Sequence, residues 1–341
     1  MRYLDSIKEV TYGLVKLNNE MSLIGLNNEF FIKDRDDQII KFPFQVLENK
    51  TRKITDKYLF YQEGKICFKV DFDTLIRSVF YEINSDFEIW ICNDDYIFLA
   101  KRTDIRREYE FSLVNLRNGI IKWSDKSMIR YFSKDDNQFL FTDFLGEIYK
   151  KRSVENGDTI WTLDFSENKI NGNVLLIKNV LVFPTTTQDL LGIEIDTGKE
   201  LWRLFNCNLY HQQQPETNYL VGLSSNSFGD NFYQVIDPIN GKILVDKKFD
   251  NFYYETQPTL ACITETHYYF ISNVIGDGTG TKSERQTHLG CINLQSHEIE
   301  WIEQIGSTSD RRSSYQKPEI NGNKIYLLDG EKTLNIYELE K

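Results

Sequence analysis

Residue types that build disulfide and metal sites are scarce in this chain. Its 341 residues include five cysteines and four histidines, and no CxxC pair occurs. An odd, widely spaced set of cysteines indicates reduced thiols within apolar strands. A structural zinc site needs more closely spaced Cys and His ligands, so we expect no metal site. The residues concerned are Cys67, Cys92, Cys207, Cys262 and Cys291, with His211, His267, His288 and His297.

Long hydrophobic runs are also missing. No window approaches the roughly 20 apolar residues that a membrane helix requires. The first ten residues, MRYLDSIKEV, lack the apolar core and the small-residue cleavage site of a secretory signal. We therefore expect a cytoplasmic protein with no membrane contact.

Basic charge is in deficit as well. The chain has 40 Lys and Arg against 51 Asp and Glu, a net charge of −11. Because a nucleic-acid binder needs a basic face, we expect no nucleic-acid partner. Aromatic residues, in contrast, make up 14% of the chain and apolar residues 40%, which favours a folded protein rich in β structure.

An internal repeat runs through the chain. Each copy has a strand, a turn that often contains Asn-Gly or Thr-Gly, and a short strand that carries a large apolar anchor residue. The five clear copies are Ser112–Trp123, Lys151–Trp161, Gly192–Trp202, Val235–Val245 and Cys291–Trp301, and the two weaker copies are Ile32–Phe42 and Lys69–Val79. The anchors are Phe42, Val79, Trp123, Trp161, Trp202, Val245 and Trp301. Their mean separation of about 43 residues matches the period of propeller blades.

The repeat predicts an all-β fold, a single β-propeller domain over residues 1–341. Each unit reads as a four-stranded antiparallel blade, because Asn-Gly and Thr-Gly supply the positive φ of tight hairpins. Eight blades fit the chain length, and seven are the alternative. Lys317–Glu340 holds three strands, so we expect a strand within Lys8–Leu17 to complete that blade and close the ring. The anchors are expected to be packing wedges between blades.

The segment Ile195–Trp202 (IDTGKELW) resembles the repeat of the PQQ-like propeller family, also known as quinoprotein alcohol dehydrogenase-like. Asp237–Lys242 with Val245 matches the repeat more loosely. The resemblance implies a propeller and includes both enzymes and scaffolds. Enzymes of this family carry adjacent cysteines beside the cofactor and calcium-binding acidic groups around the channel, and neither is identifiable here. We therefore expect a non-enzymatic, scaffold-type member that binds neither PQQ nor another cofactor.

Long loops fall on one face of the predicted propeller. They include Phe205–Asn218, Ser224–Asn231, Phe249–Glu255, Ser272–His288 and Ile305–Gln316. Loops of this length inside a compact domain are commonly functional. Aromatic and arginine side chains anchor protein interfaces, and a basic spot would suit an acidic patch on a partner. The partner-binding residues predicted on this basis are Phe228, Tyr253, Tyr254, Lys282, Arg285, Arg311 and Arg312.

Two segments resemble ligand loops without matching them. In Gly276–Ser283 the residue before the lysine is Thr281, whereas a phosphate loop has glycine at that position. The sequence that follows reads as a strand, so no helix N-terminus is available to bind phosphate. Asp34–Asp37 lacks the glycine and the distal glutamate of a calcium loop. No Gly-x-Ser-x-Gly motif occurs, so we assign no catalytic residue. The alternative left open is a hydrolase or lyase that acts on a small molecule or glycan in the central channel, using inward carboxylates.

We accordingly expect a non-catalytic, monomeric propeller that binds another protein through its long-loop face. One version is an immunity-type protein that neutralises a toxin. Another is a scaffold in a larger bacterial assembly. It would resemble the outer-membrane assembly lipoprotein of this fold, although the lipobox and leader of that protein are missing.

Overall fold

The computed structural model describes most of the chain. The described residues are 1–8, 10–16, 22–26, 29–33, 39–42, 52–54, 57–82, 87–92, 95–102, 109–115, 117–126, 128–132, 139–142, 147–207, 211–225, 231–249, 254–256, 260–274, 285–308 and 315–339. None of these residues belongs to a helix with the length and apolar character needed to cross a bilayer.

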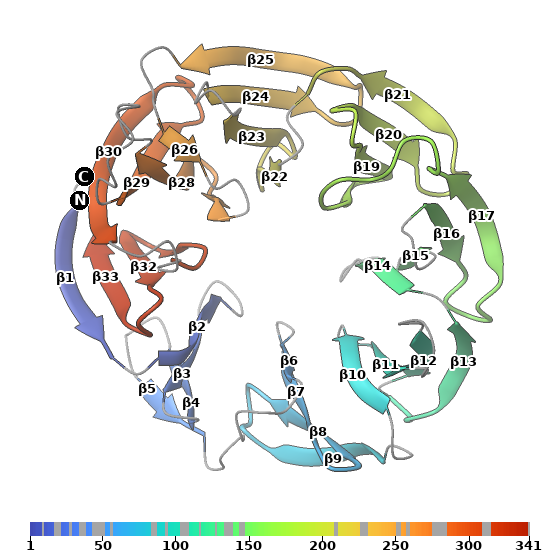
Figure 1. The fold of residues 1–341 in the computed structure, drawn as a ribbon. Coiled ribbons are helices and arrows are strands. Elements are labelled where there is room, and N and C mark those ends of the chain that lie inside the picture. Colours follow the sequence, from blue (N-terminus) through green and yellow to red (C-terminus); the bar gives the residue numbers. More distant parts are fainter. Residues whose placement is uncertain are drawn as a thin grey trace. The chain divides into compact units, whose positions relative to one another are not determined.

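Among the described residues, hydrogen bonds join the strands into eight sheets, with antiparallel pairing in each (Figure 1). The first four sheets are β2 (Val10–Lys16), β3 (Ser22–Leu26), β4 (Glu29–Lys33) and β5 (Ile39–Lys41); β6 (Arg52–Ile54), β7 (Tyr58–Glu63), β8 (Ile66–Asp71) and β9 (Arg77–Glu82); β10 (Phe87–Cys92), β11 (Tyr96–Arg102), β12 (Tyr109–Asn115) and β13 (Ile121–Lys126); and β14 (Met128–Phe132), β15 (Phe139–Thr142), β16 (Ile148–Arg152) and β17 (Thr159–Asp164). The other four are β18 (Leu175–Ile177), β19 (Val180–Pro184), β20 (Leu190–Glu194) and β21 (Glu200–Leu204); β22 (Gln212–Gln213), β23 (Leu220–Ser225), β24 (Asn231–Asp237) and β25 (Lys242–Phe249); β26 (Tyr254–Thr256), β27 (Cys262–Ile263), β28 (His267–Val274), β29 (Arg285–Asn293) and β30 (Ile299–Thr308); and β31 (Glu319–Asn321), β32 (Lys324–Leu328) and β33 (Leu334–Glu338) with β1 (Arg2–Ile7).

The chain divides into two compact units. One consists of Met1–Leu14, Asn171–Glu194 and Lys199–Lys341, and the other of Val15–Ile170 and Ile195–Gly198. Each contact described below lies within one of these units. The expectation of a single domain stays a prediction.

Middle strands are buried on both faces, and outer strands on one. All five residues of β19 are buried, whereas β25 alternates between exposed and half-buried side chains. Tyr268 and Phe270 of β28 pack into the cluster shared with the β22–β25 sheet, while Tyr269 packs into the cluster shared with β32. Since successive side chains of a strand point to opposite faces, one sheet fills the cores on both of its sides.

The hairpin between the third and fourth strands has the same geometry in several sheets. The last residue of the turn has positive φ. It is Gly119, Gly157, Gly198 or Gly241 in four sheets and His297 in a fifth, where a non-glycine residue adopts the left-handed conformation. The second residue after this positive-φ residue pairs with the third strand. The residue after that has no partner of its own on the third strand and forms a β-bulge. The anchor follows directly after this bulge, so turn and bulge together set its position.

Each anchoring tryptophan of three successive sheets contacts the turn of the next sheet. The indole Nε1 of Trp123 donates to the carbonyl oxygen of Val154 at 2.9 Å, and the Nε1 of Trp202 donates to that of Pro238 at 2.8 Å. A Cβ on Gly157 would lie 2.8 Å from the Trp123 ring, and one on Gly241 would lie 2.3 Å from the Trp202 ring. The turn glycine therefore permits both the backbone conformation and the close approach of the ring.

The predicted strand arrangement is corrected in three respects. The strand that completes the sheet of β31, β32 and β33 is β1, which pairs with β33. The predicted segment Lys8–Leu17 instead contains β2, which belongs to the β2–β5 sheet. Figure 1 shows this as blue β1 beside red β33. The seven-bladed alternative is wrong, because the described strands form eight sheets, and blades of uniformly four strands are wrong, because β27 adds a fifth strand beside β28.

The anchor assigned to Val79 is also wrong. Val79 is 56% exposed, and the residue that directly follows the bulge, the place that tryptophan holds elsewhere, is Tyr81, which pairs with Cys67. In this sheet the bulge lies at Phe80, five residues after the positive-φ residue Leu75, instead of three. A two-residue delay moves the anchor by two positions. Of the remaining anchors, Phe42, Trp123 and Trp161 are buried, and Trp202, Val245 and Trp301 are partly buried in core clusters.

Candidate functional site

The predicted partner-binding residues that are described lie at one end of the sheet containing β28, β29 and β30. Tyr254 pairs with Val274 at the end of β28, and Arg285 pairs with Thr308 at the end of β30. Because these strands are antiparallel, both residues lie at the same end of the sheet, where β28 ends at Val274, β29 begins at Arg285 and β30 ends at Thr308. We name this the long-loop end. Phe228, Tyr253, Lys282, Arg311 and Arg312 lie outside the described residues.

The opposite end of the same sheet is closed by a tight turn. The side-chain oxygen of Asn293 accepts hydrogen bonds from the amides of Gln295 and Ser296 at 2.8 and 3.0 Å. The backbone amide of His297 donates to the carbonyl oxygen of Asn293 at 2.9 Å. We name this the turn end. The additional chain length in this sheet therefore lies at the long-loop end.

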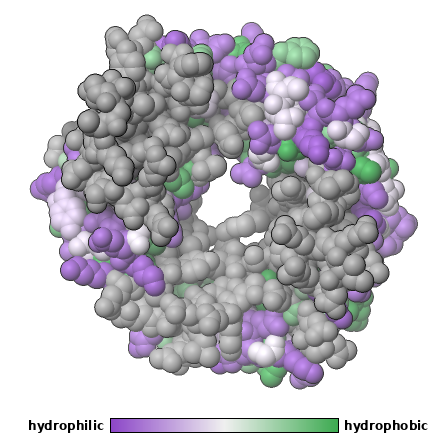
Figure 2. Space-filling model, in the orientation of Figure 1, coloured by the Kyte–Doolittle hydropathy of each residue, from purple (hydrophilic) through white to green (hydrophobic). Residues whose placement is uncertain are grey.

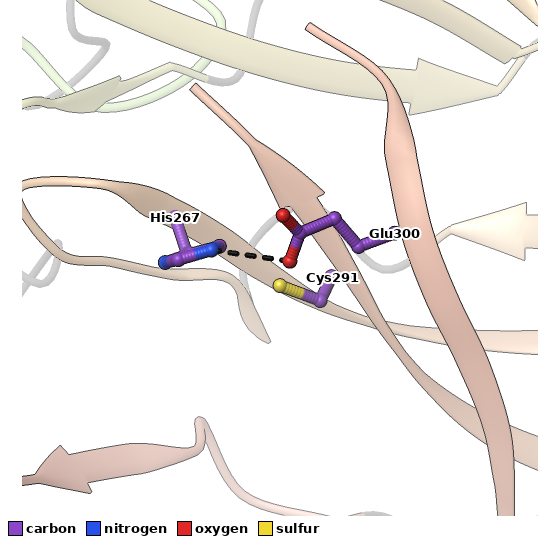
Figure 3. A group of neighbouring side chains, drawn as sticks. All are labelled: His267, Cys291 and Glu300. Carbon is purple, nitrogen blue, oxygen red and sulfur yellow. Dashed lines mark hydrogen bonds and ion pairs between the residues drawn. The ribbon is translucent and has the colours of Figure 1, made fainter. Parts of the chain in front are cut away.

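Three side chains with metal-binding atoms converge at the turn end (Figure 3). They are His267 at the start of β28, Cys291 on β29 and Glu300 on β30, and their ligand atoms all lie within 4.8 Å of one another. The Nε2 atom of His267 is 3.1 Å from a carboxylate oxygen of Glu300. Cross-strand pairing brings them together, since β29 pairs with both β28 and β30.

The three side chains differ in their exposure to solvent. Cys291 is 1% exposed and packs in an apolar cluster with Tyr269 and Leu327, and this burial raises the pKa of its thiol to about 12. The thiol is therefore protonated at neutral pH and is a poor nucleophile in this state. The side chains of His267 and Glu300 are 27% and 38% exposed, so solvent reaches one side of the cluster.

This cluster is absent from the sequence-based expectations. Its members are too far apart in the chain to form the closely spaced Cys and His motif that identifies a zinc site from sequence. The pairing register of the three strands could have revealed the cluster. In that register His267 lies opposite Asn293, and Cys291 lies opposite Trp301, the neighbour of Glu300. That alignment requires knowing where the bulge falls.

A separate buried histidine lies before β22. His211 is buried, and its Nε2 atom has no hydrogen-bond partner among the described residues. Desolvation lowers the pKa of His211 to about 4, because burial penalises the charged imidazolium. At neutral pH this side chain is uncharged.

Figure 2 colours the described residues by hydropathy. On the face shown, most of these are hydrophilic, and hydrophobic residues are scattered among them. Exposed apolar side chains include three bulge residues, Ile160, Leu201 and Leu244. Apolar residues that are exposed singly are ordinary on protein surfaces. They define no binding patch.

No family model and no curated protein matches the sequence. Solved structures match over nearly the whole chain. The computationally designed Ika8 protein has a TM-score of 0.64 at 12% identity, covering 99% of this chain and 98% of that one. BamB from Moraxella catarrhalis has a TM-score of 0.56 at 11% identity, covering 99% of both chains. The dihydro-heme d1 dehydrogenase NirN, in complex with DHE, has a TM-score of 0.56 at 13% identity, covering 96% of this chain and 70% of that one.

At these identities the similarities show the fold alone. The chain has an all-β propeller fold, and that prediction is confirmed. Membership of the PQQ-like family and the absence of enzymatic activity stay predictions.

Proposed function

We propose that this propeller is a non-catalytic module that binds another protein through its long-loop end. The observation that carries the proposal is the difference between the two ends of the sheet formed by β28, β29 and β30. Backbone and side-chain hydrogen bonds of Asn293 close one end tightly. At the other end Arg285 pairs with Thr308, and ten residues of sequence, 275–284, separate the end of β28 from the start of β29. Elaborated loops on a rigid sheet are the usual location of recognition residues.

The residue types predicted to bind suit a protein partner. Arg285, Arg311 and Arg312 carry planar guanidinium groups that pair with carboxylates in two-point contacts. Tyr253 and Tyr254 supply rigid aromatic area at low entropic cost. On a chain with net charge −11, such a local basic group favours an acidic patch on the partner over an extended polyanion.

The state of the described cysteines supports a binding role in a reducing compartment. Cys67, Cys207, Cys262 and Cys291 are buried and free. Burial raises the pKa of the Cys67 and Cys291 thiols to about 12, which disfavours nucleophilic chemistry by the protonated groups. We propose a cytoplasmic module, either an immunity-type protein or an assembly scaffold.

The test is an affinity purification from the native host with two matched variants. In one, residues 275–284 are replaced by a short Gly-Ser linker. In the other, Lys242→Glu changes an exposed residue at the turn end of β25. A stoichiometric partner that cross-links to the long-loop end, is lost with the linker variant and is kept by Lys242→Glu supports the proposal. A partner retained equally by both variants, or cross-linked only to the turn ends, contradicts it.

A further inference from the structure

We propose that His267, Cys291 and Glu300 form a zinc site at the turn end of the sheet containing β28, β29 and β30. The site is independent of the partner-binding role, because it lies at the opposite end of that sheet. It also departs from the sequence-based expectation that no metal is bound. The three ligand atoms converge, neighbouring side chains orient two of them, and the three other sheets compared below lack this combination of residues.

The β-bulge brings Glu300 into the cluster. Cys291 pairs with Trp301 and Ile292 pairs with Ile299, so Glu300 is the extra residue of β30. A bulge changes the direction of the side chain it carries, and here a carboxylate oxygen lies 3.1 Å from the Nε2 atom of His267. The Sγ atom of Cys291 lies within 4.8 Å of both other ligand atoms. Zn²⁺ would draw the three together by a small side-chain movement.

Two neighbouring side chains form hydrogen bonds with the candidate ligands His267 and Glu300. The hydroxyl of Thr266 is 2.7 Å from the Nδ1 atom of His267, the ring nitrogen that does not face Glu300. The side-chain amide of Asn293 donates to the other carboxylate oxygen of Glu300 at 2.7 Å. Partners of this kind orient the imidazole and carboxylate in metal sites, and leave Nε2 and one oxygen available to the ion.

The other sheets provide an internal comparison, since the same three register positions exist in each. In the β10–β13 sheet these positions hold Tyr96, Leu113 and Lys122. In the β18–β21 sheet they hold Val180, Gly192 and Leu201. Counted from its own bulge, the β6–β9 sheet has Phe60, Cys67 and Phe80. The repeat geometry therefore does not require ligand-type residues at these positions, although it accepts a buried cysteine.

The donor set points to zinc. Imidazole nitrogen, thiolate sulfur and carboxylate oxygen are the three zinc ligands found in proteins, and a hard oxygen-seeking ion such as Mg²⁺ would not select a thiolate. With three protein ligands, a tetrahedral ion keeps one position for water, which the partial exposure of His267 and Glu300 allows. On coordination the Cys291 thiol becomes a thiolate and its proton passes to solvent.

The test uses Zn²⁺ and Co²⁺ alone on metal-stripped protein. Zn²⁺ affinity is measured against a chromophoric chelator, and Co²⁺ loading is followed by absorption. We expect one equivalent of Co²⁺ with a near-ultraviolet thiolate-to-cobalt charge-transfer band and with visible bands of tetrahedral intensity, all abolished by Zn²⁺. His267→Gln, a change at a partly exposed residue, should weaken Zn²⁺ binding at least about 100-fold, and Asn293→Ala should weaken it about 10–100-fold.

Cys67→Ser is the matched control. Cys67, like Cys291, pairs with the residue that directly follows the bulge of its sheet, and it is likewise buried. Cys291→Ser should remove the charge-transfer band, whereas Cys67→Ser should keep it. Circular dichroism checks that each variant is folded. If Cys291→Ser does not fold, the loss of Zn²⁺ affinity in His267→Gln decides the question. Absence of stoichiometric binding, a Co²⁺ spectrum without a thiolate band, or a band lost with Cys67→Ser and kept with Cys291→Ser overturns the proposal.

Discussion

The indole Nε1 of Trp161 donates a 2.7 Å hydrogen bond to the carbonyl oxygen of Ile195, 34 residues away in the chain. The same ring lies against Gly198, where a Cβ would be 2.8 Å from the nearest ring atom. One tryptophan thus supplies apolar packing and satisfies a buried carbonyl of the following turn. This relationship explains why the repeat combines a glycine turn with a tryptophan.

Gly198→Ala should destabilise the protein by about 2–4 kcal/mol. Alanine at the φ of +72° found at Gly198 costs about 1–2 kcal/mol, and its Cβ would collide with Trp161. The free energy of unfolding is measured by urea titration. Gly64→Ala is the control, because Gly64 has a φ of +59° and no atom within 4 Å of the added Cβ. Equal losses for the two variants would show that the contact with Trp161 contributes nothing.

Trp202→Ala and Val79→Ala should differ strongly in stability. Trp202 packs in the cluster shared by the β18–β21 and β22–β25 sheets, so its truncation should cost about 3–5 kcal/mol. Val79 is 56% exposed, and its truncation should cost less than about 0.5 kcal/mol. Thermal and urea unfolding measure both values. A large loss for Val79→Ala would restore it as an anchor and contradict the register of β9.

Stability should fall as the pH decreases from 6.5 to 4, partly because of His211. The pKa of His211 is lowered to about 4 in the folded protein, against 6.5 for an unperturbed histidine. In this interval the unfolded chain binds a proton that the folded protein does not, so protonation favours unfolding. The effect is absent above pH 6.5 and complete below pH 4. His211→Gln should flatten the pH dependence of the melting temperature in this interval, and a slope identical to that of the unaltered protein would rule His211 out.

Charge reversal at Arg311 and Arg312 should weaken partner binding and leave the melting temperature nearly unchanged. Loop positions outside core elements contribute little to stability, whereas guanidinium groups at an interface contribute strongly to affinity. Binding is measured by calorimetry with the purified partner. Lys242→Glu serves as the control, a charge reversal of one exposed residue at a turn end. Unchanged affinity in the double variant removes these arginines from the proposed interface.

The repeat, its turns and most of its anchors could be predicted from sequence because local chemistry determines them. Asn115, Asp237 and Asn293 begin three of the turns and accept hydrogen bonds from turn amides, and glycine takes the positive-φ position at Gly119, Gly157, Gly198 and Gly241. These signals depend on residues that are close in the chain.

The errors arose where the structure depends on pairing between distant strands. In the turn before β9, Leu75 takes the left-handed conformation without glycine, and the bulge in β9 falls at Phe80, so the spacing from the turn no longer locates the anchor. A strand within Lys8–Leu17 was expected to pair with β33, but the partner is Arg2–Ile7, because strand register rather than local sequence decides this pairing. The cluster of His267 and Glu300 was missed for the same reason.

The recurrent bulge also affects how one molecule meets another. The fourth strand is the last in the hydrogen-bonding order of its sheet, so β13, β17, β21 and β25 each leave one edge without a strand partner in that sheet. A continuous free edge would template strand addition by a second chain and favour aggregation. The bulge breaks the row of amides and carbonyls on these strands, and β25 adds Lys242, Lys247 and Lys248. The residue that positions each anchor therefore also opposes self-association through sheet edges.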